Sequence, residues 1–170
     1  KSDGKKPSII KKHYNYLIDE IEMLREIGDT FSDKSRITAI ELSLSNGNNV
    51  AILDDGFQDF SIKPNFSILC FNSKQLIGNG LVIPSGPLRE RLSAVNRADC
   101  IIINGNKSND TLEFEKKITE NLMGKKLHFF YSNYKIKNID KLKNKSITAF
   151  AGIGNPSNFF DLLKKNKLDI

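Results

Sequence analysis

The chain has 170 residues, enough for one substantial core, and its hydrophobic content of 39% and charged content of 27% exclude a disordered or fibrous protein. Its net charge of +6 suggests an anionic partner, but 5 of the 26 basic residues are arginines and the other 21 are scattered lysines, as on an ordinary solvated surface. No apolar run is long enough to span a bilayer and the N-terminus lacks a signal-peptide pattern, so the sequence predicts neither feature here.

Apolar spacing and turn residues divide the chain into alternating helices and strands. In chain order, the predicted elements are a loop leading into an extended segment (1–12), helices at 17–28 and 33–47, strands at 49–54 and 66–71, a helix starting at Pro87, a strand at 99–104, a helix at 111–124, strands at 126–131 and 146–154, and a helix at 156–166. The predicted buried faces are Ile37, Ile40, Leu42 and Leu44 in the second helix, and Leu112, Phe114, Ile118 and Leu122 in the helix at 111–124. Asn155 is the predicted N-cap of the last helix.

This alternation favours an α/β fold with a mainly parallel sheet. We see no internal repeat and no clear domain boundary, so the sequence predicts a single α/β region over residues 1–170. Cys70 and Cys100 both lie in apolar strand-like runs, and we expect buried thiols of a reducing compartment rather than a disulfide.

The strongest chemical signal is a pair of carboxylates at the end of a predicted strand. Asp54 and Asp55 follow the apolar run at 50–53 and precede Gly56. Ligands bind at the carboxyl ends of strands in open parallel sheets, and an aspartate there is a usual way to hold Mg²⁺ beside a nucleotide phosphate. A plain Asp-Asp-Gly turn is the alternative interpretation of these residues.

Other polar signals are weaker when each is taken alone. Arg89, Arg91 and Arg97 form an arginine cluster in a lysine-dominated chain, which suggests planar donors for phosphate. A phosphate-binding loop ending in Gly-Lys-Ser or Gly-Lys-Thr, the expected companion of an Mg²⁺-binding strand end, does not occur in these residues. Asp19 and Glu20 form a second acidic pair at a predicted helix start, where complementing the helix dipole is the simpler explanation.

Four motifs together carry more information than any one of them. ILDDGFQD at 52–59 is followed by GNGLVIPSGPLRE at 78–90, RADCIIING at 97–105 and FAGIGNP at 150–156. Their order and approximate spacing resemble the tetraacyldisaccharide 4'-kinases, the lipid A 4'-kinases of Gram-negative bacteria. The resemblance extends over residues 15–160.

The resemblance implies a P-loop-kinase-like α/β fold with helices on both faces of the sheet, and a set of functional residues. It implies transfer of the ATP γ-phosphoryl group to the 4'-hydroxyl of a glucosamine-disaccharide lipid. Asp54 and Asp55 match the family's Mg²⁺-associated pair, and Gln58 belongs to the same motif. Asp19 and Glu20 match a Gly-Asp-Glu motif whose aspartate is the candidate general base. Arg89 and Glu90 match a pair on the nucleotide side.

The chain departs from the family pattern at several points. Asp59 stands where the family usually has histidine, and an anion there would repel phosphate unless the metal screens it. Ile18 replaces the glycine before Asp19. The family's Walker A loop precedes the matched region, and its C-terminal histidine motif follows it, so we expect this chain to be the middle of a kinase and inactive alone. Residues 146–170 would then begin a C-terminal subdomain.

The resemblance also implies partners and a location. The expected cofactors are ATP and Mg²⁺, the expected acceptor is the lipid A disaccharide precursor, and the expected location is the cytoplasmic face of the bacterial inner membrane, contacted peripherally through this region. No nucleic acid is expected. The alternatives are a non-catalytic remnant of the kinase and a basic α/β module that binds nucleic acid.

Overall fold

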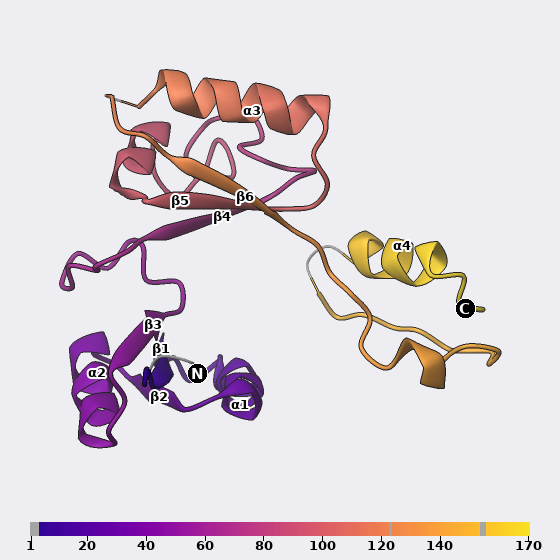
Figure 1. Cartoon of the computed structure of the whole chain (residues 1–170), viewed down its shortest axis with the longest axis horizontal. Helices are drawn as coiled ribbons and strands as arrows, with labels where there is room; N and C mark the ends of the chain where they lie inside the picture. Colours follow the sequence, from indigo (N-terminus) through magenta and orange to yellow (C-terminus); the bar gives the residue numbers. More distant parts are fainter. Residues whose placement is uncertain (1–3, 123, 154–155) are drawn as a thin grey trace. The chain divides into compact units, whose positions relative to one another are not determined.

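The computed structural model describes residues 4–122, 124–153 and 156–170, and the chain forms two compact units, residues 1–65 and 66–170 (Figure 1). The first unit contains β1 (Pro7–Lys12), α1 (Ile18–Ile27), β2 (Thr30–Asp33), α2 (Arg36–Ser45) and β3 (Val50–Leu53). The second contains β4 (Ile68–Asn72), the 3-10 helix η1 (Leu92–Arg97), β5 (Cys100–Asn104), α3 (Asn109–Glu120), β6 (His128–Ser132), the 3-10 helix η2 (Ile139–Lys141) and α4 (Ser157–Lys165).

The first unit is built on a parallel sheet in the order β2-β1-β3. The connections through α1 and α2 run in opposite directions across the sheet, so right-handed crossovers place these helices on opposite faces, as Figure 1 shows. The central strand β1 is therefore covered on both sides, and its Ser8, Ile10 and Lys11 are buried. β2 was not predicted from the sequence, because its four residues, TFSD, have no strand pattern and become a strand by pairing with β1.

Helix α2 packs on the sheet through small residues, which corrects the predicted apolar face. Its buried residues are Arg36, Ala39 and Ser43, whereas Ile37, Leu42 and Leu44 are exposed. Positions 36, 39 and 43 lie on one side of a helix, and the small side chains at 39 and 43 allow a close approach to β1. The Ser43 and Ser8 hydroxyls share a hydrogen bond of 2.6 Å at this contact.

The second unit has a parallel sheet in the order β4-β5-β6. The central strand β5 provides much of the core, with Ile101 and Ile103 fully buried. α3 starts at a capping box formed by Ser108 and Thr111. It buries Phe114 and Ile118 as predicted, while Leu112 is exposed.

Two predicted elements differ in the structure. No helix starts at Pro87: Leu88 donates its N–H to the Leu81 carbonyl, and Ile83 donates to the Leu88 carbonyl, so these backbone groups are already paired within the loop. Among the described residues of 146–154 there is no strand, only an isolated bridge between Ser146 and Asp169, because no neighbouring strand pairs with the segment. The last helix is present, but Asn155 lies outside the described residues.

The two cysteines are free thiols in different environments. Cys100 is buried as predicted, whereas Cys70 is exposed. The neighbouring Phe71 packs against Phe114 of α3, with ring centroids 4.9 Å apart. Because side chains alternate along a strand, Cys70 points away from α3, and the prediction that it is buried is wrong.

The predicted α/β class with parallel strands is confirmed. The prediction of one α/β region over 1–170, with a further subdomain from 146, concerns the organisation of the whole protein and stays a prediction beside the two units found here.

Candidate active site

The acidic residues after β3 lie beside a buried lysine. The sheet register pairs Ile10 of β1 with Leu53 of β3, which brings the next residues, Lys11 and Asp54, side by side at the carboxyl ends of the strands. Lys11 Nζ lies 2.6 Å from Asp54 Oδ2 and 3.1 Å from Glu20 Oε2. The lysine therefore joins the strand-end carboxylate to the first turn of α1.

The charge of Lys11 is maintained by these two carboxylates. Its side chain is 8% exposed, and burial by itself would lower the pKa of the ammonium group. Hydrogen bonds to Asp54 and Glu20 outweigh burial, so the pKa of Lys11 is raised above its usual 10.5. Lys11 was not predicted from the sequence, because it is one lysine in a lysine-rich segment; its place in a strand pattern beside isoleucines was the available signal.

The two acidic residues of α1 lie in different environments. Both are in the first turn, as predicted, where they complement the helix dipole. Glu20 contacts Lys11, whereas Asp19 is exposed and its side chain makes no hydrogen bond or ion pair with the described residues. The structure thus brings Glu20, and not Asp19, to Asp54 through a shared partner.

The acidic turn, residues 54–56, has a constrained backbone. Asp55 is exposed and adopts φ of 51°, in the left-handed region that aspartate tolerates better than most residues. A Cβ on Gly56 would lie 2.7 Å from Leu53 Cβ, so only glycine fits there without a shift.

Arg36 of α2 holds this turn from the other side. Its side chain is 8% exposed, and Nη2 donates to the carbonyl oxygens of Asp54 at 3.0 Å and Asp55 at 2.8 Å. Nη1 lies 2.9 Å from Asp59 Oδ2. Nε is buried and has no hydrogen-bond partner among the described residues. Arg36 was also missed; an arginine at a helix start in a chain with few arginines was its only sequence signal.

Asp59 is held by two partners. Its Oδ1 accepts hydrogen bonds from the backbone N–H and hydroxyl of Ser61, and its Oδ2 faces Arg36. Ser61 and then Arg36 lower the pKa of Asp59 to about 2, so the carboxylate is charged at neutral pH. The predicted repulsion by an anion at this position is countered by a guanidinium group that the sequence did not reveal.

The remaining predicted residues are distributed over both units. Gln58 is half-buried in the segment after the acidic turn. Arg89 and Glu90 belong to the second unit, where Arg97 Nη2 lies 2.8 and 2.9 Å from the two carboxylate oxygens of Glu90. Arg97 of the predicted arginine cluster is therefore paired with Glu90, a predicted nucleotide-binding residue. Arg89, next to Glu90 in the chain, is exposed.

The strand-end carboxylates suit a magnesium ion. Mg²⁺ is usually held by one or two protein carboxylates together with substrate phosphates and water. Asp54 and Asp55 would be such a pair, and no group of three or more histidine, cysteine, aspartate or glutamate side chains in the described part of the chain could hold a metal. The donor set fits an ion shared with a substrate rather than a closed structural site.

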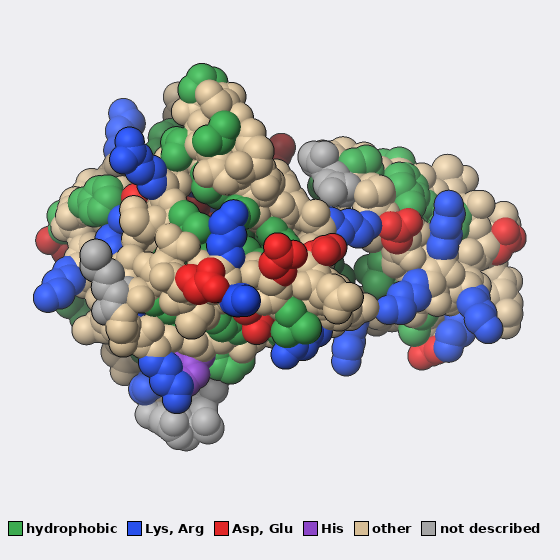
Figure 2. All heavy atoms as spheres, turned by 90° about the horizontal axis from the view of Figure 1, so that it is seen from above, with side chains coloured by type: hydrophobic (Ala, Val, Ile, Leu, Met, Phe, Trp, Pro, Cys, Tyr) green, Lys and Arg blue, Asp and Glu red, His purple; other side chains and the backbone are tan. Residues whose placement is uncertain are grey.

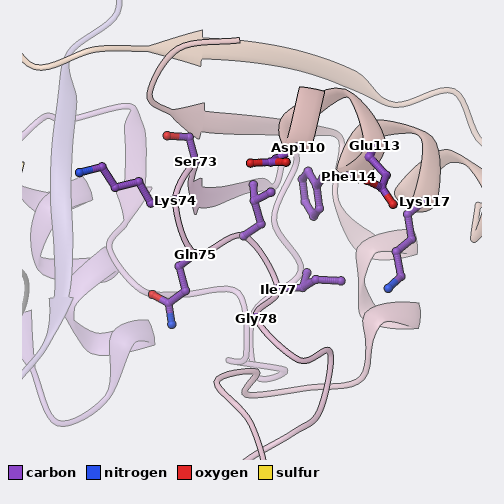
Figure 3. Close-up of a pocket in the computed structure, with 10 residues that line it drawn as sticks. Ser73, Lys74, Gln75, Ile77, Gly78, Asp110, Glu113, Phe114 and Lys117 are labelled. Carbon is purple, nitrogen blue, oxygen red and sulfur yellow. The ribbon is translucent and has the colours of Figure 1, made fainter. Parts of the chain in front are cut away.

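A separate hollow lies in the second unit. A cavity of about 300 Å³ is formed between the loop after β4 and helix α3, and Phe114 extends from α3 toward the loop (Figure 3). Among the described residues that line it, charges of both signs occur, with Lys74 and Lys117 beside Asp110 and Glu113. None of the residues predicted for the active site lines this cavity.

Charges of both signs are mixed on the surface seen in Figure 2. Figure 2 shows basic side chains spread among acidic ones on the visible face rather than gathered in a stripe. Within the described residues, no helix combines the length and the apolar character needed to cross a membrane.

Comparison with protein families decides the affiliation. Residues 13–170 match the family model described as Tetraacyldisaccharide-1-P 4'-kinase, and this range includes the acidic turn, Arg36 and Glu90. The chain belongs to this family. Lys11, two residues before the matched range, lies next to it in the same site.

Individual relatives agree with the family. The chain is 40% identical to a tetraacyldisaccharide 4'-kinase of Pelagibacter ubique, over 95% of this chain and 51% of the relative. It is 32% identical to that of Colwellia psychrerythraea (93% and 50%) and 35% identical to that of Haemophilus influenzae (77% and 37%). The chain thus spans about half the length of the first two of these relatives, or less for the third. No solved structure matches it.

Proposed function

We propose that the protein containing this chain transfers the γ-phosphoryl group of ATP to the 4'-hydroxyl of a tetraacyl-disaccharide 1-phosphate lipid, a step of lipid A biosynthesis. Family membership supports the reaction class. The observation that carries the proposal to particular residues is the acidic turn at the carboxyl end of β3, with Lys11 and Arg36 on either side of it.

The acidic turn would act on the phosphate side of the reaction. Bound there, Mg²⁺ would neutralise charge on the phosphates of ATP as the phosphoryl group is transferred. Asp55 is the better candidate ligand, because it lies further from the apolar run of β3 and directly before Gly56. Asp54 would then hold Lys11 and the end of β3 in place.

The acceptor hydroxyl needs a base, and α1 carries the candidates. Asp19 is exposed and its carboxylate is not used within the described structure, which suits a group that waits for a substrate proton. Glu20 already lies 3.1 Å from Lys11 Nζ, so it is suited to positioning. Asp19 as base and Glu20 as its neighbour are the assignments that we propose.

The remaining assignments concern the nucleotide and the location. Gln58, Arg89 and Glu90 would bind the nucleotide, with Arg97 orienting Glu90. The fold would be that of a P-loop kinase with helices on both faces of its sheet. The protein would meet the cytoplasmic face of the inner membrane peripherally through this region, where each basic residue near an anionic surface contributes about 1 kcal/mol.

The test is an assay of the full-length protein in detergent micelles with radiolabelled ATP. The monophosphorylated disaccharide lipid and its deacylated sugar are offered side by side. We expect transfer to the lipid in preference to the sugar, and a loss of at least about a hundredfold in kcat for Asp55→Ala with an unchanged circular dichroism spectrum.

Other outcomes decide against the proposal. Equal transfer to both acceptors would remove the lipid specificity. No transfer by a folded protein would favour the non-catalytic remnant. Binding of DNA or RNA that weakens steeply with salt would favour the nucleic-acid module.

A further inference from the structure

In the interaction of Arg36 with the acidic turn, one nitrogen contacts two successive carbonyl groups. Nη2 donates to the oxygens of Asp54 and Asp55, at 3.0 and 2.8 Å. These two contacts orient both peptide planes toward α2. The orientation of the peptide planes in turn limits the directions that the two carboxylates can take.

The turn needs such support because its backbone is costly. Asp55 has φ of 51°, a left-handed conformation that is unfavourable for a non-glycine residue, although aspartate tolerates it better than most. Leu53 leaves no room for a Cβ on Gly56, and Arg36 supplies hydrogen bonds to the carbonyl groups of Asp54 and Asp55.

Asp59 in turn holds Arg36. A buried guanidinium group is unfavourable without a counter-charge, and the Asp59 carboxylate, 2.9 Å from Nη1, supplies it. The Asp59 side chain is 16% exposed and is fixed by two hydrogen bonds from Ser61. The chain of contacts therefore runs from Ser61 through Asp59 and Arg36 to the acidic turn.

We propose that Arg36 is a positioning residue that sets the geometry of the acidic turn for a divalent cation, and that Asp59 is the positioning residue that fixes Arg36. This inference rests on the proposed function, since it assumes that the turn holds the cation. The inference gives Asp59 a role, namely to hold Arg36. Without such a role, a negative charge at this position would only repel phosphate. Neither residue touches the reacting atoms in this role.

The test measures binding of Mn²⁺ alone to the full-length protein, by water-proton relaxation. Arg36→Lys keeps the charge but replaces the planar guanidinium fork, and Asp59→Asn keeps the size but removes the counter-charge. We expect Mn²⁺ affinity to fall about tenfold or more in Arg36→Lys, the range seen when a residue behind a metal ligand is changed, and to fall by a smaller factor in Asp59→Asn. The matched controls are Arg25→Lys and Glu22→Gln, the exposed ion pair on α1, which should bind Mn²⁺ as the wild type does.

A merely structural role would give a different pattern. It would lower the melting temperature of Arg36→Lys and Asp59→Asn while leaving Mn²⁺ affinity unchanged in the folded protein, and that result would overturn the inference. If Arg36→Lys does not fold, Asp59→Asn decides alone by the same measurement. A wild-type protein that binds no Mn²⁺ also overturns it.

The same samples separate this inference from the proposed function. A wild-type protein that binds Mn²⁺, loses affinity in the two variants and phosphorylates no lipid supports the positioning role and contradicts the proposed reaction. In an active protein, kcat should fall in both variants while KM for the lipid stays within about twofold of the wild-type value.

Discussion

The buried cations near the carboxyl ends of β1 and β3 each contact more than one partner. Lys11 lies between Asp54 and Glu20, and Arg36 lies between the acidic turn and Asp59. Both cations are nearly buried. Breaking a fully buried pair leaves an uncompensated charge that costs about 3–5 kcal/mol, and the cost is smaller for Lys11 because solvent reaches Asp54 and Glu20. The site is thus arranged by residues whose charges already have partners before a substrate arrives.

The roles of Asp19 and Glu20 can be separated by substitution. Asp19→Asn in the full-length protein should lower kcat by about a hundredfold or more, because the amide cannot accept the hydroxyl proton. Glu20→Gln should lower kcat less, since it only weakens the contact with Lys11. Single-turnover kinetics with saturating ATP measures both. A variant Asp19→Asn that changes only KM for ATP would show that Asp19 binds or caps instead.

The low pKa of Asp59 predicts a pH window. The pKa is about 2 in the folded protein and 3.8 in the unfolded chain, so the unfolded state binds the proton more readily. The stabilising effect of the carboxylate is fully present above pH 4 and is lost as pH falls toward 2. Urea unfolding of the wild type and Asp59→Asn should give midpoints that differ at pH 6 and converge as pH falls. A difference that stays constant down to pH 2.5 would contradict this.

At the scale of elements, α2 is positioned by the small residues on its buried face. Ala39 is fully buried and the Ser43 hydroxyl contacts that of Ser8 in β1, so the helix lies close to the sheet. This closeness places the first residue of α2, Arg36, within reach of the turn after β3. The helix packing and the site geometry are therefore linked.

A larger side chain at the contact between α2 and the sheet should disturb both the helix packing and the geometry of the acidic turn. Ala39→Leu adds methylene groups at a site with no space, which costs about 1–3 kcal/mol of unfolding free energy. A leucine introduced at an exposed position of the same helix, Ile37→Leu, should cost less than about 0.5 kcal/mol of unfolding free energy. Thermal unfolding compares the two in the full-length protein. Equal melting temperatures for both variants would show that α2 is not closely packed at Ala39.

At the scale of the whole molecule, the two units contain different parts of the proposed machinery. The acidic turn, Lys11 and Arg36 belong to residues 1–65, and Arg89 and Glu90 belong to residues 66–170. The family relation covers both units, and the chain spans about half of its first two relatives.

The 170-residue chain by itself should bind Mg²⁺·ATP weakly. These residues contain no Gly-Lys-Ser or Gly-Lys-Thr loop to supply the backbone N–H groups and the lysine that bind the β- and γ-phosphates. Calorimetry should show an affinity at least about tenfold weaker than that of the full-length protein, with circular dichroism as the control for folding. Low-micromolar binding by the 170-residue chain would contradict this expectation and indicate another phosphate site.

The sequence by itself determined the α/β class, most of the strands and helices, and the family. These depend on local patterns, such as the apolar run before Asp54, and on ordered motifs that can be recognised without knowing which residues are in contact. The tertiary structure alone decided what surrounds the acidic turn. Lys11 reaches Asp54 only because β1 and β3 pair in parallel register, and Arg36 reaches Asp59 only because α2 packs closely on the sheet. Both contacts join residues more than 20 positions apart, and a long-range ion pair has no periodic pattern in the sequence, since its partners are brought together by packing.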